Sequence, residues 1–181
     1  MRKDTRRRPS AHRLNICVCL FACVFLLQAY WTAATAAGEV PRLAVFNFEL
    51  LDTSLEGETA GKNEAEQTRL VLISDLLRQM ITESKRYEVV DIGPLSERIA
   101  EAGYLRSCNG CDARFARDLG ADQSLTGVVQ KVSNLILNIN LYLRDAGSGD
   151  LLKVMSADIR SNSDQSWSRG VSWLVRNRLL K

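Results

Sequence analysis

Residues 135 to 144, LILNINLYLR, alternate without a break between apolar and mostly polar side chains. A period of two places successive side chains on opposite faces of a β-strand. The pattern therefore predicts a strand with one face in a core and one face toward solvent, in a sheet that is covered on one side. The apolar positions are Leu135, Leu137, Ile139, Leu141 and Leu143, and between them stand Ile136, Asn138, Asn140, Tyr142 and Arg144.

The segments on either side of this strand predict two more strands. Residues 123–132 form the first, in which Gly127 is expected to mark a β-bulge, and Ser133-Asn134 makes a tight connection. Residues 146–149, AGSG, predict a turn, after which residues 151–159 form the third strand. Short connections of this kind join antiparallel neighbours, so the three strands are expected to form an antiparallel meander.

The first half of the chain shows both strand and helix patterns of apolar residues. Residues 42–50 predict a strand and residues 51–63, which lack an apolar period, predict a loop. Residues 64–86 carry apolar side chains at three- and four-residue steps without Gly or Pro, which indicates an amphipathic helix. Residues 87–92 predict a second strand, parallel to the first because a helix separates them.

Three further helices complete the expected order. Residues 94–102 and 112–119 predict two short ones, and Ser163-Asp164 offers an N-cap for a closing helix with Trp167, Val171, Leu174 and Val175 on one face. The order β-α-β-α-α-β-β-β-α favours the α/β (α+β) class, with a mixed sheet of about five strands and helices packed on it. We expect residues 37–181 to be a single domain.

Residues 1–36 have the three parts of a secretory signal peptide. A basic stretch precedes the apolar run 14–31, and the small residues 32–38 contain an A-x-A pattern that predicts cleavage between Ala36 and Ala37. A retained membrane anchor is the alternative, because the apolar run approaches the length that spans a bilayer. We expect export to the periplasm by the general secretion route, with membrane contact only through the signal peptide.

Removal of that segment changes the charge of the chain. What remains has 18 basic and 20 acidic groups and no histidine, since the single histidine lies at position 12. No basic surface for nucleic acid is left, a Ser-His-Asp set is impossible, and the acids show no catalytic pairing. We therefore assign no catalytic residue, expect no cofactor, and leave the question of enzymatic activity open with a preference for none.

Cys108 and Cys111 are the pair with the clearest chemical content. Two thiols without histidine are too few for a zinc site, so a structural disulfide and a thiol–disulfide exchange site remain. A predicted helix after the pair favours exchange because its N-terminus lowers a thiol pKa. Asp112 disfavours a thiolate. The thioredoxin arrangement also places the motif after a strand and opposite a proline loop, whereas here it joins two short predicted helices and the prolines of residues 37–181 are Pro41 and Pro94.

The segment 57–63, GETAGKN, follows a predicted strand and precedes a helix, as a phosphate-binding loop does. Its spacing is one residue short, and Asn63 stands where Ser or Thr would hold magnesium. We interpret it as a flexible loop.

The passage from the last strand into the closing helix predicts a binding surface. Trp167 would anchor a partner or small ligand, and Arg160 or Arg169 would hold a carboxylate. A helix cap with one core tryptophan and solvated charges is the other interpretation, and the sequence favours it over a binding site. The full candidate surface is Lys131, Asn134, Arg160, Asn162, Asp164, Trp167 and Arg169.

The stretches 129–137 and 158–170 resemble a family of small secreted bacterial proteins of unassigned function, some of them encoded near quinoprotein alcohol dehydrogenases. The resemblance covers most of residues 40–181, including the cysteine pair and 119–122, although Ser161 stands where the family usually has glycine. More remotely, the strand 44–46, a Gly-Ala-Asp before a strand and the hairpin 145–149 are similar to the amino-terminal domain of the Tol-system translocation protein and to the curli-secretion lipoprotein.

These resemblances imply a periplasmic accessory or assembly role. The leading hypothesis is a non-enzymatic periplasmic module that binds a protein partner or small ligand and serves an alcohol-oxidising quinoprotein system. Two alternatives are a thiol–disulfide oxidoreductase or redox sensor that uses the cysteine pair, and an envelope assembly protein that oligomerises through a sheet edge.

Overall fold

The computed structural model describes residues 39–181, which include a compact unit from Val40 to Lys181. The expected signal peptide and its cleavage position between Ala36 and Ala37 lie outside the described residues. Within residues 39–181 no helix combines the length and apolar character that crossing a membrane requires.

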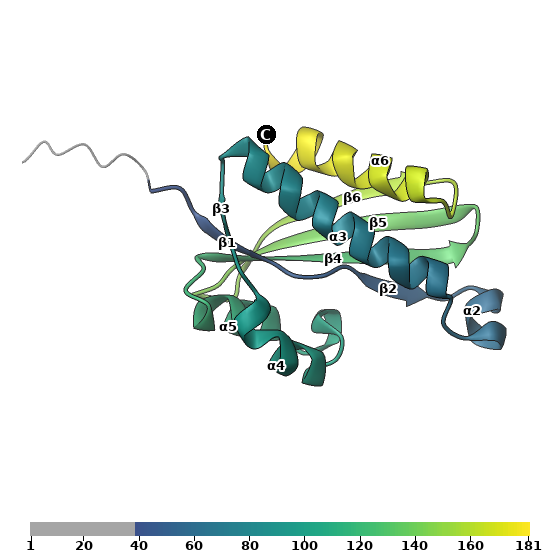
Figure 1. Ribbon diagram of the computed structural model, residues 1–181, viewed down its shortest axis with the longest axis horizontal. Coiled ribbons are helices and arrows are strands. Elements are labelled where there is room, and N and C mark those ends of the chain that lie inside the picture. The colour runs from purple at the N-terminus through teal and green to yellow at the C-terminus, as the bar shows by residue number, and fades with distance from the viewer. Residues whose placement is uncertain (1–38) are drawn as a thin grey trace, which may run out of the picture. The chain divides into compact units, whose positions relative to one another are not determined.

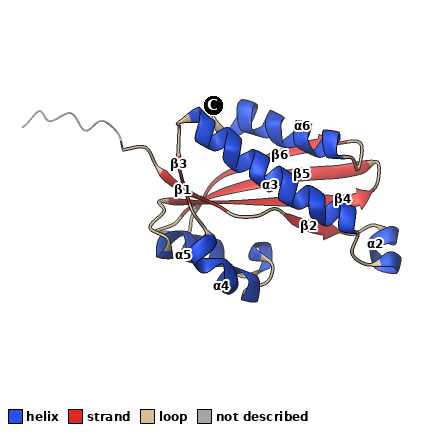
Figure 2. Cartoon of the chain, viewed as in Figure 1, coloured by secondary structure: helices blue, strands red, loops and turns tan. Residues whose placement is uncertain are grey.

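A six-stranded mixed sheet forms the centre of the unit (Figures 1 and 2). Its order is β3-β1-β4-β5-β6, and β2 pairs with β4 beyond the end of β1. The pairs β1–β3, β1–β4 and β2–β4 are parallel, and β4–β5–β6 is the expected antiparallel meander. The predicted fold class is confirmed. The strands are β1 (Arg42–Val45), β2 (Glu49–Asp52), β3 (Glu88–Val90), β4 (Gln123–Ser133), β5 (Ile136–Asp145) and β6 (Leu151–Ile159).

Helices pack on both faces of the sheet and enclose two cores (Figure 1). The larger core lies under α3 and α6, and the smaller one joins Ala44 of β1 and Phe46, just after that strand, to α5 and the segments around it. Alternation along β1 explains the division, because Leu43 and Val45 face the larger core. The helices are α2 (Leu55–Ala60), α3 (Glu64–Ser84), α4 (Ser96–Glu101), α5 (Cys111–Asp118) and α6 (Asp164–Leu174), with short turns η1 (Gly93–Leu95), η2 (Leu105–Ser107) and η3 (Val175–Leu179).

The first predicted strand is divided in two, which gives six strands instead of about five. The backbone hydrogen bonds of this segment to the neighbouring strand are interrupted at Phe48, whose N–H donates instead to the Ser74 hydroxyl at 2.9 Å. The Phe48 ring lies against Gly127, where an added Cβ would be 2.3 Å from a ring carbon. The predicted bulge at Gly127 is therefore wrong: Gly127 makes room for Phe48, and the register shift falls between Lys131 and Ser133.

The predicted loop over residues 51–63 is also wrong in part, because it contains the end of β2 and helix α2. The Ser54 hydroxyl caps α2 by accepting from the Gly57 amide, and Asn63 caps α3 in the same way. A helix of six residues without buried side chains has no apolar period to detect.

The sheet face opposite α3 and α6 carries the polar positions of the alternating pattern. Asn138, Asn140 and Tyr142 are half-buried there. The Asn138 amide donates to Asp158 at 2.7 Å, and the Ser156 hydroxyl lies 2.9 Å from the Asn140 oxygen. These contacts between β5 and β6 agree with the expected solvent-facing side of the strand.

Candidate functional site

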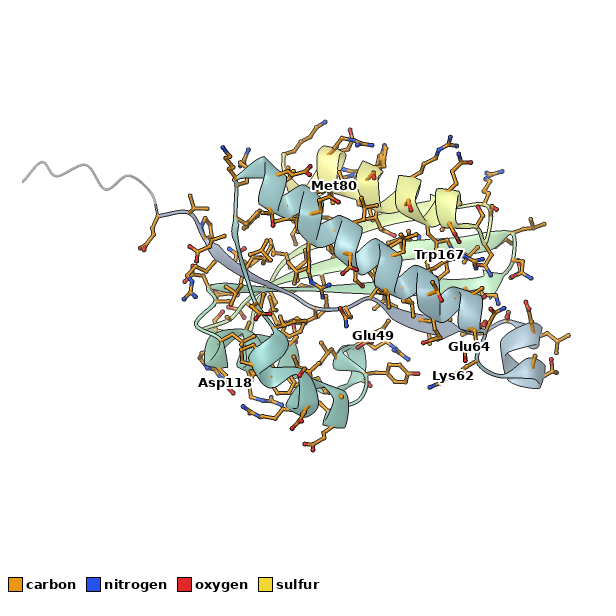
Figure 3. All side chains as sticks on the ribbon, in the orientation of Figure 1. Glu49, Lys62, Glu64, Met80, Asp118 and Trp167 are labelled. Carbon is orange, nitrogen blue, oxygen red and sulfur yellow. A yellow bond between two sulfur atoms is a disulfide. The ribbon has the colours of Figure 1, made fainter. Side chains whose placement is uncertain are left out.

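Six of the seven predicted surface residues occupy two neighbouring places. Lys131, Asn134, Asn162 and Asp164 belong to a polar network at the end of the sheet where β4 meets β5, and Arg160 and Arg169 line a groove beside β6. Trp167 belongs to neither surface because its side chain is fully buried in the larger core (Figure 3). The structure therefore agrees with the core tryptophan that the sequence favoured, and Trp167 is not exposed as an anchor for a partner.

Lys131 is a buried cation, only 1% exposed, surrounded by three carboxylates. Its ammonium lies 2.7 Å from Glu66, 3.2 Å from Asp52 and 3.3 Å from Glu56. Glu66 is equally buried, whereas Glu56 is half-exposed. We call these residues, together with Asn134 and Asn162, the Lys131 cluster. Burial of a charge is costly unless it is paired. The burial of Lys131 therefore requires β2, α2 and α3 to bring their carboxylates to this point of β4.

Two asparagines connect the cluster to the passage before α6. The Asn162 amide donates to Glu66 at 2.6 Å and lies 2.9 Å from the Asn134 oxygen, and the Asn134 amide donates to Glu56 at 2.9 Å. Next to them, Arg69 donates to Asp164 at 2.6 Å and to Asn162 at 3.2 Å. These side chains form hydrogen bonds and ion pairs with one another, and we interpret the network as structural support for the neighbouring surface.

Ionisation in the cluster follows from these contacts. Burial alone would lower the pKa of Lys131, but hydrogen bonds to Glu66, Asp52 and Glu56 outweigh it and hold that pKa above its ordinary value. Burial raises the pKa of Asp52, but hydrogen bonds from Ser54 and Lys131 outweigh it and leave that pKa below the ordinary value. The lysine is therefore held in its charged form and is not available as a nucleophile or base.

A groove of about 740 Å³ runs between β6 and α6, and we call it the β6–α6 groove. One wall is the end of β6, from Ser156 to Ile159, and the other is the face of α6 that carries Arg169 and Trp173. Gly170 lies in the groove and lets α6 approach the sheet, because a Cβ there would be 2.8 Å from Ile139 and Ile159. The absence of a side chain at Gly170 thus allows α6 to pack close to β5 and β6.

The groove has free hydrogen-bonding and charged groups. Among residues 39–181, β6 pairs with β5 alone, so the backbone groups on its outer side have no strand partner there. Arg160 and Arg169 are exposed and form no ion pair or hydrogen bond with any residue from 39 to 181. Trp173 is 43% exposed. The arrangement can pair with an extended backbone and with carboxylates at the same time.

A family model described as "Protein of unknown function (DUF2380)" matches residues 41–179. The family that carries this description is designated DUF3280, and the chain belongs to it. A comparison with curated proteins finds no match. Membership in a family of unknown function agrees with the resemblance seen in the sequence, and supplies no residue role.

Several solved structures are similar in fold. The C-terminal domain of LpoB from Salmonella enterica is 14% identical, with 75% of this chain and 93% of that chain covered and a TM-score of 0.49. Lipoprotein GNA1162 from Neisseria meningitidis is 18% identical, with 77% and 97% covered and a TM-score of 0.46. TolB from Acinetobacter baumannii is 13% identical, with 81% and 30% covered and a TM-score of 0.43.

Cys108 and Cys111 form a disulfide, with Cα atoms 5.6 Å apart. Cys111 is the first residue of α5 and is buried in the smaller core, and Cys108 is half-buried. The buried carboxylate of Asp112 accepts a hydrogen bond from Ser124 at 2.7 Å and lies 3.3 Å from Arg144. The bridge thus joins η2 to α5 beside a buried polar pair.

Opening this disulfide is expected to lower the free energy of unfolding by about 2 kcal/mol, because so short a loop restricts the unfolded chain only slightly. Urea unfolding of the oxidised protein, the reduced protein and a Cys108→Ala/Cys111→Ala variant measures the loss. A reduction potential close to that of thiol–disulfide exchange proteins, together with insulin reduction, would contradict a purely structural bridge.

The sequence did not indicate the three carboxylate partners of Lys131, or Arg69, which contacts Asp164 and Asn162 beside them. Asp52, Glu56, Glu66 and Arg69 were not predicted as site residues. One signal was available for Glu66, which stands four residues before Leu70 on the buried face of α3. The remaining partners reach the cluster only through the topology of the sheet.

Proposed function

We propose that the protein is a non-enzymatic, exported binding module that captures an acidic, extended segment of a partner protein in the β6–α6 groove. The observation that carries this proposal is the open outer edge of β6, nine residues long, beside two arginines without ionic partners among the described residues. An edge strand offers backbone N–H and C=O groups in a row that an added strand can use.

The composition of the groove favours one kind of occupant. Arg160 and Arg169 would each hold a carboxylate, with paired hydrogen bonds that a neutral side chain does not offer. Trp173 adds an aromatic surface of the type common in binding hot spots. A second copy of this chain would present the same two arginines and its own β6, whereas an acidic segment supplies the carboxylates that these arginines lack within residues 39–181.

The sequence supports the proposals of export and of an accessory role in alcohol oxidation. The apolar run 14–31 and the small residues before Ala37 support secretion to the periplasm. The resemblance to proteins encoded near quinoprotein alcohol dehydrogenases favours an accessory role in alcohol oxidation. Deletion of the gene is then expected to lower periplasmic alcohol oxidation, and unchanged oxidation and envelope integrity would count against the role.

Binding of a fluorescent peptide of alternating valine and glutamate residues tests the groove directly. We expect the peptide to bind, with an affinity that falls as salt is added. Arg160→Ala and Arg169→Ala should each weaken binding about tenfold, the loss that one charge-assisted contact of about 1.4 kcal/mol produces. Fluorescence anisotropy of the purified protein measures these affinities.

Two controls separate strand pairing from charge attraction. Arg86→Ala removes an exposed arginine outside the groove and should leave binding unchanged. A peptide with N-methyl groups on alternate amides keeps its charge but loses backbone donors, and we expect it to bind weakly. Equal binding of both peptides, or no effect of either groove arginine, would overturn the proposal. Sedimentation of the free protein as an oligomer would support the assembly alternative instead.

A further inference from the structure

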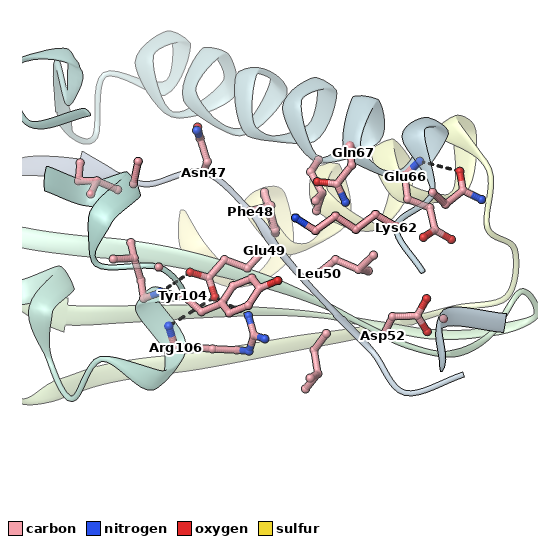
Figure 4. Close-up of a pocket in the computed structure, with 18 of the residues that line it drawn as sticks. Asn47, Phe48, Glu49, Leu50, Asp52, Lys62, Glu66, Gln67, Tyr104 and Arg106 are labelled. Carbon is pink, nitrogen blue, oxygen red and sulfur yellow. Dashed lines mark hydrogen bonds and ion pairs between the residues drawn. The ribbon is translucent and has the colours of Figure 1, made fainter. Parts of the chain in front are cut away.

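A cavity of about 670 Å³ lies beside β2, on the side of that strand away from β4 (Figure 4). Within the part of the chain that the structure describes, β1 has β3 and β4 as neighbours, whereas β2 pairs with β4 alone. The chain leaves the sheet after Val90, at the end of β3, and turns into η1. The place next to β2 is therefore not filled by a strand, and α3 and the segment from α4 to η2 enclose it.

The interior of the cavity is largely apolar. Its size falls within the range of small-molecule sites, which combine apolar walls with a few polar groups. Apolar side chains come from β2, α3, α4 and η2, and from the residues just before β2 and η1. They are Phe48, Leu50, Leu70, Ile92, Ile99 and Leu105.

Most of the charged side chains that line the cavity are already paired. Glu49 accepts from the Leu105 amide and forms an ion pair with Arg106 at 2.9 Å. Asp52 and Glu66 belong to the Lys131 cluster. These contacts use the negative charges of the lining and one of its positive charges.

Lys62 is the charged group of the lining that forms no ion pair or hydrogen bond with residues 39–181. It stands between the end of α2 and the start of α3, where Gly61 has a φ of 72° and Asn63 caps α3. The side chain extends along the cavity toward Phe48 (Figure 4). The two helix ends thus position the backbone of Lys62, and its exposed side chain lines the cavity with an ammonium group that has no ionic partner within residues 39–181.

We propose that this cavity binds a small amphipathic carboxylic acid, with its apolar body between β2, α3 and α4 and its carboxylate at Lys62. The site lies apart from the β6–α6 groove, and the proposal does not depend on the proposed function. Burial of the apolar body supplies most of the affinity. The charge of Lys62 then selects an acid over a neutral molecule of the same shape.

Titration with cis-parinaric acid, a fluorescent unsaturated fatty acid, and with its methyl ester tests the assignment on the purified full chain. We expect the acid to bind about tenfold more tightly than the ester. Lys62→Met should abolish that preference while the ester binds as before, and Lys181→Met, at the exposed last residue, should keep it. Ala100→Phe, on the α4 wall, should weaken binding of both probes by filling the cavity.

Three results would overturn the proposal. They are equal affinity for the acid and the ester, an acid preference that survives in Lys62→Met, and binding of both probes that Ala100→Phe leaves unchanged. Far-ultraviolet circular dichroism of each variant confirms that it is folded, and Lys62→Arg, which keeps the charge, should restore the preference for the acid. A failure here leaves peptide binding in the β6–α6 groove unaffected, so the two proposals are separable.

Discussion

Replacement of Lys131 by methionine is expected to lower the free energy of unfolding by about 3–5 kcal/mol. The substitution keeps a side chain of similar length but leaves the buried carboxylate of Glu66, and the mostly buried one of Asp52, without their cation. Breaking a buried pair costs more than the pair itself contributes, because the remaining charge is no longer compensated. Urea unfolding at pH 7, followed by circular dichroism, measures the loss.

Two further variants show whether the loss comes from the uncompensated charge. Glu66→Leu in the Lys131→Met background replaces the buried pair by apolar side chains and should recover most of the stability. Glu56→Gln alters the half-exposed end of the cluster and should have a far smaller effect than Lys131→Met. If the double variant is as unstable as Lys131→Met, the loss has another cause.

Acid is expected to reduce the difference between the wild type and Lys131→Met. The folded pKa of Asp52 lies below its ordinary value of 3.8, so its stabilising contribution is present above that value and is lost as the pH falls through the folded pKa. The wild type should therefore lose stability below about pH 4. In the variant, protonation neutralises carboxylates that have no cation, which offsets part of that loss. Urea midpoints at pH 7 and pH 3.5 compare the two proteins.

Trp167→Ala is the second substitution with a large expected effect, a loss of about 3–5 kcal/mol in the free energy of unfolding. The indole is fully buried in the larger core with Val171 and Leu174 of its own helix, so its removal leaves a cavity under α6. Thermal and urea unfolding give the size of the loss. A loss below about 1 kcal/mol would mean that the core collapses around the site.

Trp173→Ala is the matched control, because Trp173 lies on the same helix but in the β6–α6 groove. This variant should change stability by no more than about 0.5 kcal/mol while it weakens binding of the acidic peptide. Trp167→Phe should be milder than Trp167→Ala. It keeps most of the buried ring and removes an N–H group that has no hydrogen-bond partner within residues 39–181.

Local sequence patterns predicted the elements in which the polarity of neighbouring side chains shows which of them are buried. The alternation of residues 135–144 predicted β5, although Leu135 itself lies in the turn and is exposed. The expected β6 has the bounds of the prediction, and Ser163 caps α6 as expected. In each case the period or the cap is a property of a few adjacent residues, so no tertiary contact was needed to recognise it.

Elements that depend on distant contacts were not predictable in this way. The segment 42–50 is apolar nearly throughout, and its division into β1 and β2 is fixed by Ser74 and Gly127, far along the chain. Lys131 occupies an inward position of β4, two residues after the buried Val129. That placement signals a buried cation, but its carboxylates come from β2, α2 and α3, and no local pattern indicates that these meet.

The unpaired edge of β6 also has a consequence for the solubility of the free protein. Leu151, Leu152 and Val154 are about half exposed along the first part of the strand, which contains no proline. Strands of this kind promote precipitation at high concentration unless charges keep other chains away. Arg160 and Arg169 supply such a charge at the far end of β6, so a variant that lacks both should precipitate at a lower concentration than the wild type.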